Sequence, residues 1–175
     1  MENGNNLGLR HDRVKIVPHN SDWKDIYEKE EKLLYPVFRK YNVDIRHIGS
    51  TSITGLVAKP IIDIMIGFEN LANVNECILE IMKLGYCYFG ECGRSGRKFF
   101  VKEQQGLTTH HLHIVEQGSK YWENNLLFKD ILTKNNSSRK RYEKLKRDLA
   151  RKHQNDREAY RKGKSNFINK ILSDN

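Results

Sequence analysis

Cysteine is scarce in this sequence of 175 residues, which contains only Cys77, Cys87 and Cys92. Three is an odd number, and no two of them form a C-x-x-C pair. This pattern argues against a secreted domain held together by disulfides. Since no charged and then apolar leader segment precedes them, we expect a reduced, cytoplasmic setting.

Long apolar runs are also missing. A membrane span needs about 18 consecutive apolar residues, and the longest candidate segments here are broken by Asp63 or by lysines. We therefore expect no membrane association through a spanning helix.

Acidic side chains are in the minority, with 22 against 31 basic ones, so the formal net charge is +9. A surface of this kind attracts phosphates, nucleic acid or anionic membranes without selecting among them. The length suits one domain. Residues 1–12 are rich in Asn and Gly and predict a flexible tail, which leaves 13–175 as a single domain.

Apolar periodicity predicts an α/β (α+β) fold, with a mixed β-sheet flanked by helices. A helix is expected from Ser21 to about Phe38 and another from Asn70 to Gly85. Strands are expected over 43–48, 60–68, 86–91, 97–104 and 110–116. From Trp122 to the end, 122–175, the pattern is helical, and we expect two basic helices there.

The turn His47–Ser52 places Gly49, Ser50, Thr51 and Ser52 directly after a predicted strand. Backbone N–H groups and hydroxyls in such a turn can bind phosphate. The spacing is not that of a P-loop, because the Gly-Lys pair is absent. A purely structural turn is the alternative for this motif taken alone.

Asp63 lies midway along a strand that is otherwise almost entirely isoleucine. A buried carboxylate costs several kcal/mol unless a cation or donors meet it, which predicts a partner. The alternative is an aspartate at a strand end that caps the next helix.

His111 and His113 alternate along another predicted strand, so both imidazoles point the same way. Such a pair can bind a metal or act in acid-base chemistry, although one buried, hydrogen-bonded histidine is the common alternative. We expect this strand to lie beside that of Asp63, so that the three side chains converge. His110 would then face the other side in a structural role.

Basic residues crowd the predicted hairpin, namely Arg94, Arg97 and Lys98, and Lys59 precedes Pro60. If the hairpin tip folds over the Gly49 turn, these side chains could bind a polyphosphate. A solvated, edge-protecting hairpin is the alternative.

The segment "HIGSTSITGLVAKPIIDIMI" resembles the signature of the GrpB family, which is related to the nucleotidyltransferase superfold. The blocks "GRSGRKFF", "THHLHIVEQGS", "LLFKDIL", "YEKLKRDLA" and "DREAYRKGKSNFI" resemble later parts of that family in the same order, over roughly residues 13–172. The resemblance implies a mixed sheet, a Gly-Ser turn for nucleotide phosphates, and paired carboxylates for divalent metal ions.

Mapped on this sequence, the resemblance implies that Gly49 and Ser50 form the turn and that Asp63 is the first carboxylate. Met65 occupies the position of the second carboxylate, and His111 or His113 falls where a third acid is expected. A thioether is a poor Mg²⁺ ligand, and imidazole favours Mn²⁺, Zn²⁺ or Fe²⁺. We therefore predict metal ligands Asp63, His111 and His113, with Asp63 and His113 as catalytic residues.

The function expected from this reading is transfer of a nucleotidyl group from a nucleoside triphosphate to an unknown acceptor. A divalent cation is expected as cofactor, either Mg²⁺ or Mn²⁺, with Zn²⁺ as the alternative. A non-catalytic module that binds a nucleotide or phosphorylated coenzyme is the alternative, favoured by Met65. RNA binding by the C-terminal helices is a third. Its basic residues would be Arg139, Lys140, Lys144, Lys146, Arg147, Arg151 and Lys152.

Overall fold

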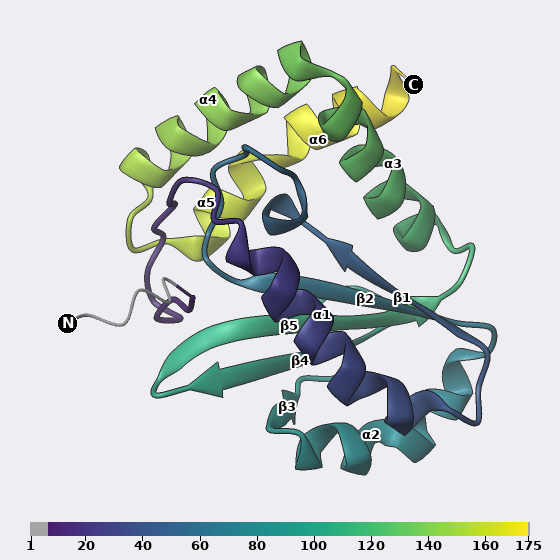
Figure 1. Ribbon diagram of the computed structural model, residues 1–175. Coiled ribbons are helices and arrows are strands. Elements are labelled where there is room, and N and C mark those ends of the chain that lie inside the picture. Colours follow the sequence, from purple (N-terminus) through teal and green to yellow (C-terminus); the bar gives the residue numbers. More distant parts are fainter. Residues whose placement is uncertain (1–6, 175) are drawn as a thin grey trace.

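The computed structural model describes residues 7–174 and contains one five-stranded mixed sheet (Figure 1). The strands are β1 (Val43–Ile48), β2 (Ile62–Phe68), β3 (Tyr86–Tyr88), β4 (Arg97–Gln104) and β5 (Leu107–Glu116). Their order is β1-β2-β5-β4-β3, and only the β2–β5 pair is parallel. This is the mixed sheet that the sequence predicts, with β2 between β1 and β5.

One face of the sheet is covered by α1 (Asp22–Leu34), the short helix η1 (Tyr35–Phe38) and α2 (Val74–Lys83). Alternation along β2 explains this packing, because Ile62, Ile64 and Ile66 all point into the core beneath α1 and α2. Pro36 does not break the chain direction there, since it occupies the first turn of η1. Two further one-turn helices are η2 (Ser50–Ser52) and η3 (Leu71–Asn73).

The opposite face of β2 carries Met65, which packs with Ile48, Val115 and Trp122. Trp122 belongs to α3 (Lys120–Lys134), the first of the C-terminal helices. Gly67 allows this contact, because a Cβ there would lie 2.9 Å from the Trp122 ring. The C-terminal helices are therefore placed on the face of β2 that also bears Asp63.

Four helices, not two, make up the described C-terminal part. They are α3, α4 (Asn136–Lys152), α5 (Arg157–Gly163) and α6 (Ser165–Ser173). Capping residues cause the extra breaks: the Asn135 side chain accepts from the Ser138 N–H, and that of Asp156 accepts from the Ala159 N–H. None of the described helices has the length and apolar character needed to cross a bilayer.

The predicted flexible tail, residues 1–12, divides into two parts. Residues 1–6 lie outside the described residues. The following segment packs on the domain, because Leu9 is buried and forms an isolated bridge with Thr108 of β5, and the Gly8 N–H donates to the Pro60 carbonyl. Gly8 and Leu9 are thus in contact with the domain, and flexibility of residues 1–12 stays a prediction.

Candidate active site

A cavity of about 570 Å³ lies between the sheet and helices α4 and α5. It is lined by nearly all of the side chains that the sequence singles out. These are Gly49, Ser50, Thr51, Lys59, Asp63, Arg94, Arg97, His111 and His113. Gly49 and His113, which are 64 positions apart in the chain, thus meet in one place. Ser52 and Lys98 do not line the cavity.

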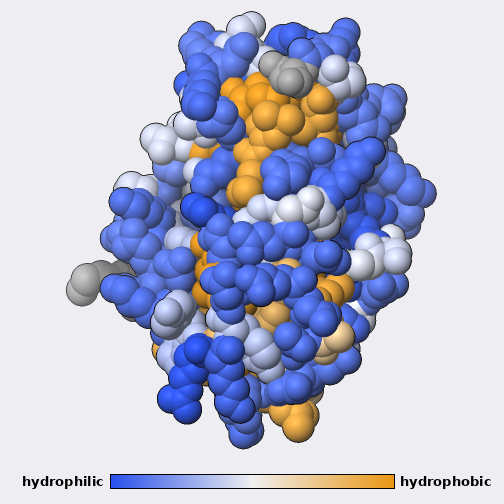
Figure 2. Space-filling view, turned by 90° about the vertical axis from the view of Figure 1, so that its right-hand side faces the viewer, coloured by the Kyte–Doolittle hydropathy of each residue, from blue (hydrophilic) through white to orange (hydrophobic). Residues whose placement is uncertain are grey.

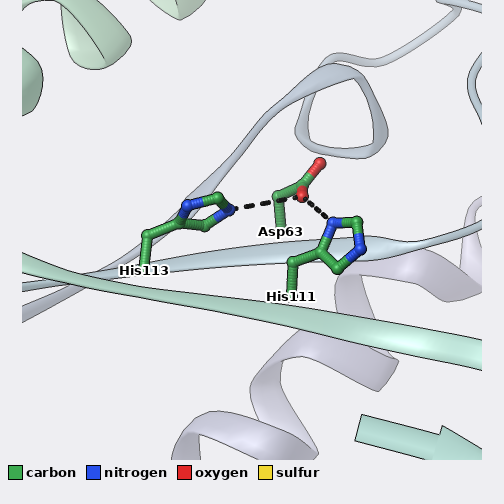
Figure 3. A group of neighbouring side chains, drawn as sticks. All are labelled: Asp63, His111 and His113. Carbon is green, nitrogen blue, oxygen red and sulfur yellow. Dashed lines mark hydrogen bonds and ion pairs between the residues drawn. The ribbon is translucent and has the colours of Figure 1, made fainter. Parts of the chain in front are cut away.

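Asp63 is held against β5 by the parallel pairing of the two strands, which puts it opposite His111 and puts Met65 opposite His113. Its Oδ1 lies 2.9 Å from His111 Nδ1 and 3.6 Å from His113 Nε2, as Figure 3 shows. Asp63 is the second residue of β2, not its middle, because strand pairing begins only at Ile62 after Pro60. The predicted convergence of the three side chains is present.

The electrostatic state of the three groups suits a cation. Burial alone would raise the pKa of Asp63, but a hydrogen bond from His111 and charge interactions with His111 and His113 hold it well below its usual value. Burial lowers the pKa of His113. The carboxylate is therefore ionised and His113 neutral at pH 7, which is the protonation that metal ligands require.

His113 has two further neighbours on its other ring nitrogen. The Tyr121 hydroxyl lies 3.1 Å from Nδ1, and a guanidinium nitrogen of Arg97 lies 3.3 Å from it. A guanidinium can only donate, so Nδ1 carries the lone pair in this arrangement and Nε2 carries the proton that faces Asp63. In contrast, His111 donates from Nδ1 to Asp63, which leaves the lone pair on its Nε2.

The turn at Gly49 has φ of +71°, which favours glycine, and leads into η2. The Ser52 hydroxyl donates back to the Gly49 carbonyl at 2.7 Å, and the Thr51 hydroxyl lies 3.0 Å from His47 Nε2. These two hydroxyls therefore hold the turn together. Ser50 lines the cavity next to the Tyr142 side chain, which makes it the hydroxyl best placed for a ligand.

The predicted basic residues of the hairpin separate into different roles. The Arg97 guanidinium donates to the Glu91 and Cys92 carbonyls and so secures the hairpin at the edge of the cavity. Arg94 lies over the Tyr121 ring at 5.3 Å and is exposed at the cavity mouth. Lys98 does not reach the cavity, because neighbouring residues of β4 point to opposite faces of the sheet.

Several cavity residues were not singled out for this site from the sequence. They are Tyr121, Tyr142, Tyr160, Arg157, Arg161, Lys164 and Lys146. Lys146 was assigned to an exposed RNA-binding face, but only 2% of it is exposed and its ammonium donates to the Val57 carbonyl. One signal was available, because Lys146 follows Tyr142 by four residues and so shares its inward face.

The helix α4 carries two acids, Glu143 and Asp148, which pair with three of its exposed basic side chains. Arg147 pairs with Glu143 at 2.7 Å, and Lys144 pairs with Asp148 at 3.2 Å. Arg151 also pairs with Asp148. An exposed helix face with internal ion pairs is a weak nucleic-acid footprint.

A second carboxylate is absent from the Asp63 group. Met65 is fully buried among apolar side chains and lies beneath α3, away from the cavity. The only other acid lining the cavity is Glu158, which is exposed and pairs with Lys162 at 2.7 Å. The described residues thus provide one carboxylate for a metal, not a bridging pair.

One divalent cation fits this donor set. Asp63, His111 and His113 each offer a ligand atom, and these atoms lie within 4.8 Å of one another. The 3.6 Å between Asp63 Oδ1 and His113 Nε2 is too long for a hydrogen bond. Two ligands at roughly 2.1 Å from one ion lie about 3 to 3.5 Å apart, which is close to this distance, and the cation would bind once the His113 proton has moved from Nε2 to Nδ1. Mixed N and O donors favour Mn²⁺, Zn²⁺ or Fe²⁺ over Mg²⁺.

An adjoining cavity of about 500 Å³ shares Gly49, Ser50 and Tyr121 with the first. Its walls combine the amides Asn124, Asn125 and Asn169 with apolar side chains that include Phe128 and Ile168, and the cations Arg94, Lys120 and Lys129 also line it. Figure 2 shows an apolar area over the C-terminal helices within a mostly hydrophilic surface. The two cavities thus adjoin at the Gly49 turn, and the second one differs from the first by its additional amides and its larger share of apolar side chains.

Comparison with known proteins agrees with this architecture. A family profile described as "GrpB protein" matches residues 13–174. The glutamate-rich protein GrpB of Alkalihalophilus pseudofirmus is 37% identical over 172 residues, which cover 96% of this chain and 99% of the relative. A crystal structure of GrpB from Enterococcus faecalis matches with a TM-score of 0.84 and 31% identity, over 91% of this chain and 96% of that one.

A more distant likeness concerns the fold alone. The structure of a GLD-2/RNP-8 complex matches with a TM-score of 0.54 and 10% identity, over 87% of this chain and 58% of that one. The chain thus shares the fold of that chain, and the mixed sheet flanked by helices that the sequence predicts is confirmed.

Proposed function

The chain belongs to the GrpB family, and we propose that it binds a nucleoside triphosphate with one divalent cation and transfers the nucleotidyl group to an acceptor. The observation that carries this proposal is the position of Asp63 directly beside the Gly49 turn, in a cavity that His113 and several basic side chains also line. A phosphate on the turn would lie next to the carboxylate that holds the cation.

Each side chain has a role in the proposed complex. The phosphates lie on the Gly49–Ser50 turn, with Arg94 and Arg97 neutralising their charge. Asp63 and His113 hold the cation, whose positive charge stabilises the negative charge of the phosphates during transfer. The sugar and base extend into the adjoining cavity, where Asn124 and Asn125 offer amide groups and Phe128 an aromatic surface.

Transfer is an in-line displacement at the α-phosphorus. An oxygen or nitrogen of the acceptor forms the new bond to phosphorus, and the bond to the bridging oxygen breaks, so that pyrophosphate leaves with the electron pair. The proton of the attacking group passes to His111 Nε2, which carries a lone pair because Nδ1 donates to Asp63. This geometry favours His111 over His113, which was predicted as catalytic, as the proton acceptor.

A non-catalytic nucleotide-binding protein is the second candidate, and Met65 favours it, since a bridging second carboxylate is missing. Such a protein would bind its ligand with or without a cation. A transferase needs the cation to position the triphosphate.

A thermal-shift panel separates the two. The four nucleoside triphosphates are tested with and without Mn²⁺ and Mg²⁺ on the unchanged protein and on Asp63→Asn. The proposal predicts a rise in melting temperature that requires both a nucleotide and a cation and is lost in the variant. Stabilisation by nucleotide alone, equal in both proteins, supports the binding module. No response to any nucleotide contradicts both candidates.

A further inference from the structure

Five basic side chains outside the hairpin also line the cavity. We call this set, Lys59, Lys146, Arg157, Arg161 and Lys164, the distal basic wall. It is built from the loop before β2, from α4, from α5 and from the junction of α5 with α6. Four separate segments therefore contribute cations to the same wall. A solvated helix face, in contrast, would involve one segment only.

The charges of the distal basic wall are balanced only in part by protein acids. Asp63 attracts four of its members without pairing directly with any of them, namely Lys59, Lys146, Arg157 and Lys164. Among the described residues, no ion pair involves any of the five side chains. Of the two acids that line the cavity, Asp63 is occupied by histidines and Glu158 pairs with Lys162. Partly buried cations without a directly paired counter-charge are costly, and an anionic ligand would supply that charge.

Hydrogen-bonding capacity in the wall is also unused. One terminal nitrogen of Arg157 is buried and has no partner, although the other donates to the His11 carbonyl. Lys59 and Lys164 both rest on the Tyr160 ring, at 5.6 Å and 4.6 Å from its centre. The two ammonium groups are thus held in place by an aromatic side chain while their donors stay available.

The pKa values agree with crowded, desolvated cations. Burial, with help from Lys164 and Arg157, lowers the pKa of Lys59 to about 7, and burial lowers that of Lys164 to about 8. Burial and the charges of Lys164 and Lys59 hold the pKa of Lys146 well below its usual value. An anion between these groups would restore their protonated forms.

We propose that the distal basic wall is a second anion site, which binds the phosphate group of a phosphorylated small molecule that serves as the acceptor. The inference rests on the proposed function, in which the Gly49 turn, Arg94 and Arg97 already hold the nucleotide. A transferase must bind both substrates in one cavity, with the reacting atoms about 3 to 3.5 Å apart. The wall fills that second place, because it lines the same cavity as Asp63.

A small molecule fits better than a nucleic-acid backbone. Lys146 is almost fully buried, and Lys59 and Lys164 are only partly exposed. A nucleic-acid backbone follows an exposed basic groove, whereas these three lysines lie within the wall of the cavity. A phosphomonoester can enter the cavity and be surrounded by several donors.

The test compares two lysines of the same helical region. Lys164→Gln removes a charge from the wall, and Lys162→Gln removes one that points outward to Glu158. Binding of inorganic phosphate and of ribose 5-phosphate, with ribose as the neutral control, is measured by calorimetry on the full chain. We expect affinity for both phosphates to fall at least tenfold in Lys164→Gln, to change less than twofold in Lys162→Gln, and ribose not to bind.

Nucleotide binding separates the failure of this inference from that of the proposed function. Binding of nucleotide with Mn²⁺ should stay within threefold in Lys164→Gln. Equal loss of phosphate affinity in both variants, or loss of nucleotide affinity together with phosphate affinity, overturns the second site. So does an oligoribonucleotide without terminal phosphate that outcompetes ribose 5-phosphate. If nucleotides do not bind at all but the phosphate result holds, the anion site stands and the proposed function fails.

A second variant guards against misfolding. Lys59→Met removes a different cation of the wall and should lower phosphate affinity in the same direction. If Lys59→Met folds and binds phosphate as the unchanged protein does, the second site is overturned even where Lys164→Gln fails to fold.

Discussion

Gly49 and Asp63 lie in direct contact, with the Asp63 carboxylate against the Cα of the glycine. A Cβ added at position 49 would collide with Oδ2 of Asp63 and lie 3.1 Å from its Cβ. The strand register places these residues side by side, because Ile48 is paired with Asp63. The phosphate-binding turn and the proposed metal ligand therefore form one unit, and neither can be altered without the other.

Gly49→Ala is the first test of that unit. We expect it to displace the Asp63 side chain and to abolish cation-dependent nucleotide binding. Gly55→Ala is the matched control, since Gly55 also has positive φ, at +79°, but a Cβ there would meet nothing within 4 Å. Both variants should lose about 1 kcal/mol from backbone strain. Calorimetric titration with nucleotide and Mn²⁺ measures the difference in nucleotide affinity. Equal affinities in the two variants would show that the turn and Asp63 do not act together.

Substitution of Met65 tests whether a carboxylate at this position would restore a two-metal site. Met65→Asp should not restore a two-metal site, because position 65 is buried against Trp122 and Val115. It should instead lower the free energy of unfolding by more than about 3 kcal/mol, since the carboxylate is buried among apolar groups. Met65→Leu should cost less than about 1.5 kcal/mol. Chemical denaturation measures both, and a stable aspartate variant that binds a second Mn²⁺ would show that the assignment is wrong.

Cation and nucleotide should bind cooperatively. Arg97 donates a hydrogen bond to Nδ1 of His113, so the ring proton lies on Nε2. A cation can bind Nε2 only when the proton lies on Nδ1 instead. A nucleotide phosphate that draws Arg97 away removes the obstacle, and Tyr121 can then accept from Nδ1–H. We expect Mn²⁺ affinity to rise at least tenfold with nucleotide present, and nucleotide affinity to rise equally with Mn²⁺. Titration of Mn²⁺ by electron paramagnetic resonance checks this, and independent binding would contradict it.

Stability should depend on pH through the lysines of the cavity. The pKa of Lys59 is about 7 in the folded protein and that of Lys164 about 8, whereas an unfolded lysine titrates near 10.4. Between about pH 7 and 10 the unfolded chain binds more protons, so the free energy of unfolding rises with pH in that window. Below pH 7 this gain is absent.

Lys59→Met should flatten that rise, whereas Lys162→Met should leave it unchanged, because Lys162 pairs with Glu158 on the exposed side of α5. Urea denaturation at pH 7, 8 and 9 provides the comparison. A rise of equal slope in Lys59→Met would show that this lysine does not titrate in the window.

The sheet and the Asp63 group were predictable because each depends on local patterns. The alternation of β2 and β5 fixes which side chains share a face, so that Asp63, His111 and His113 could be expected to converge. The register that puts His111 opposite Asp63 is a tertiary property, and no residue pattern encodes it.

The helical side of the cavity could not be predicted from the sequence, for a different physical reason. Lys146, Arg157 and Lys164 lie in helices whose composition is mostly basic, and composition does not distinguish an inward lysine from a solvated one. Asn135 and Asp156 break the helical region into short pieces that bring these residues over Asp63. Capping residues were visible in the sequence, but the angles between successive helices follow from packing.

The most direct test of the account is the anomalous difference map of a crystal grown with Mn²⁺ and a non-hydrolysable nucleoside triphosphate. The account predicts a single strong peak in contact with Asp63 and His113, with phosphate density on the Gly49–Ser50 turn. A nucleotide bound there without Mn²⁺ at Asp63, or one bound elsewhere on the protein, would contradict the central claim.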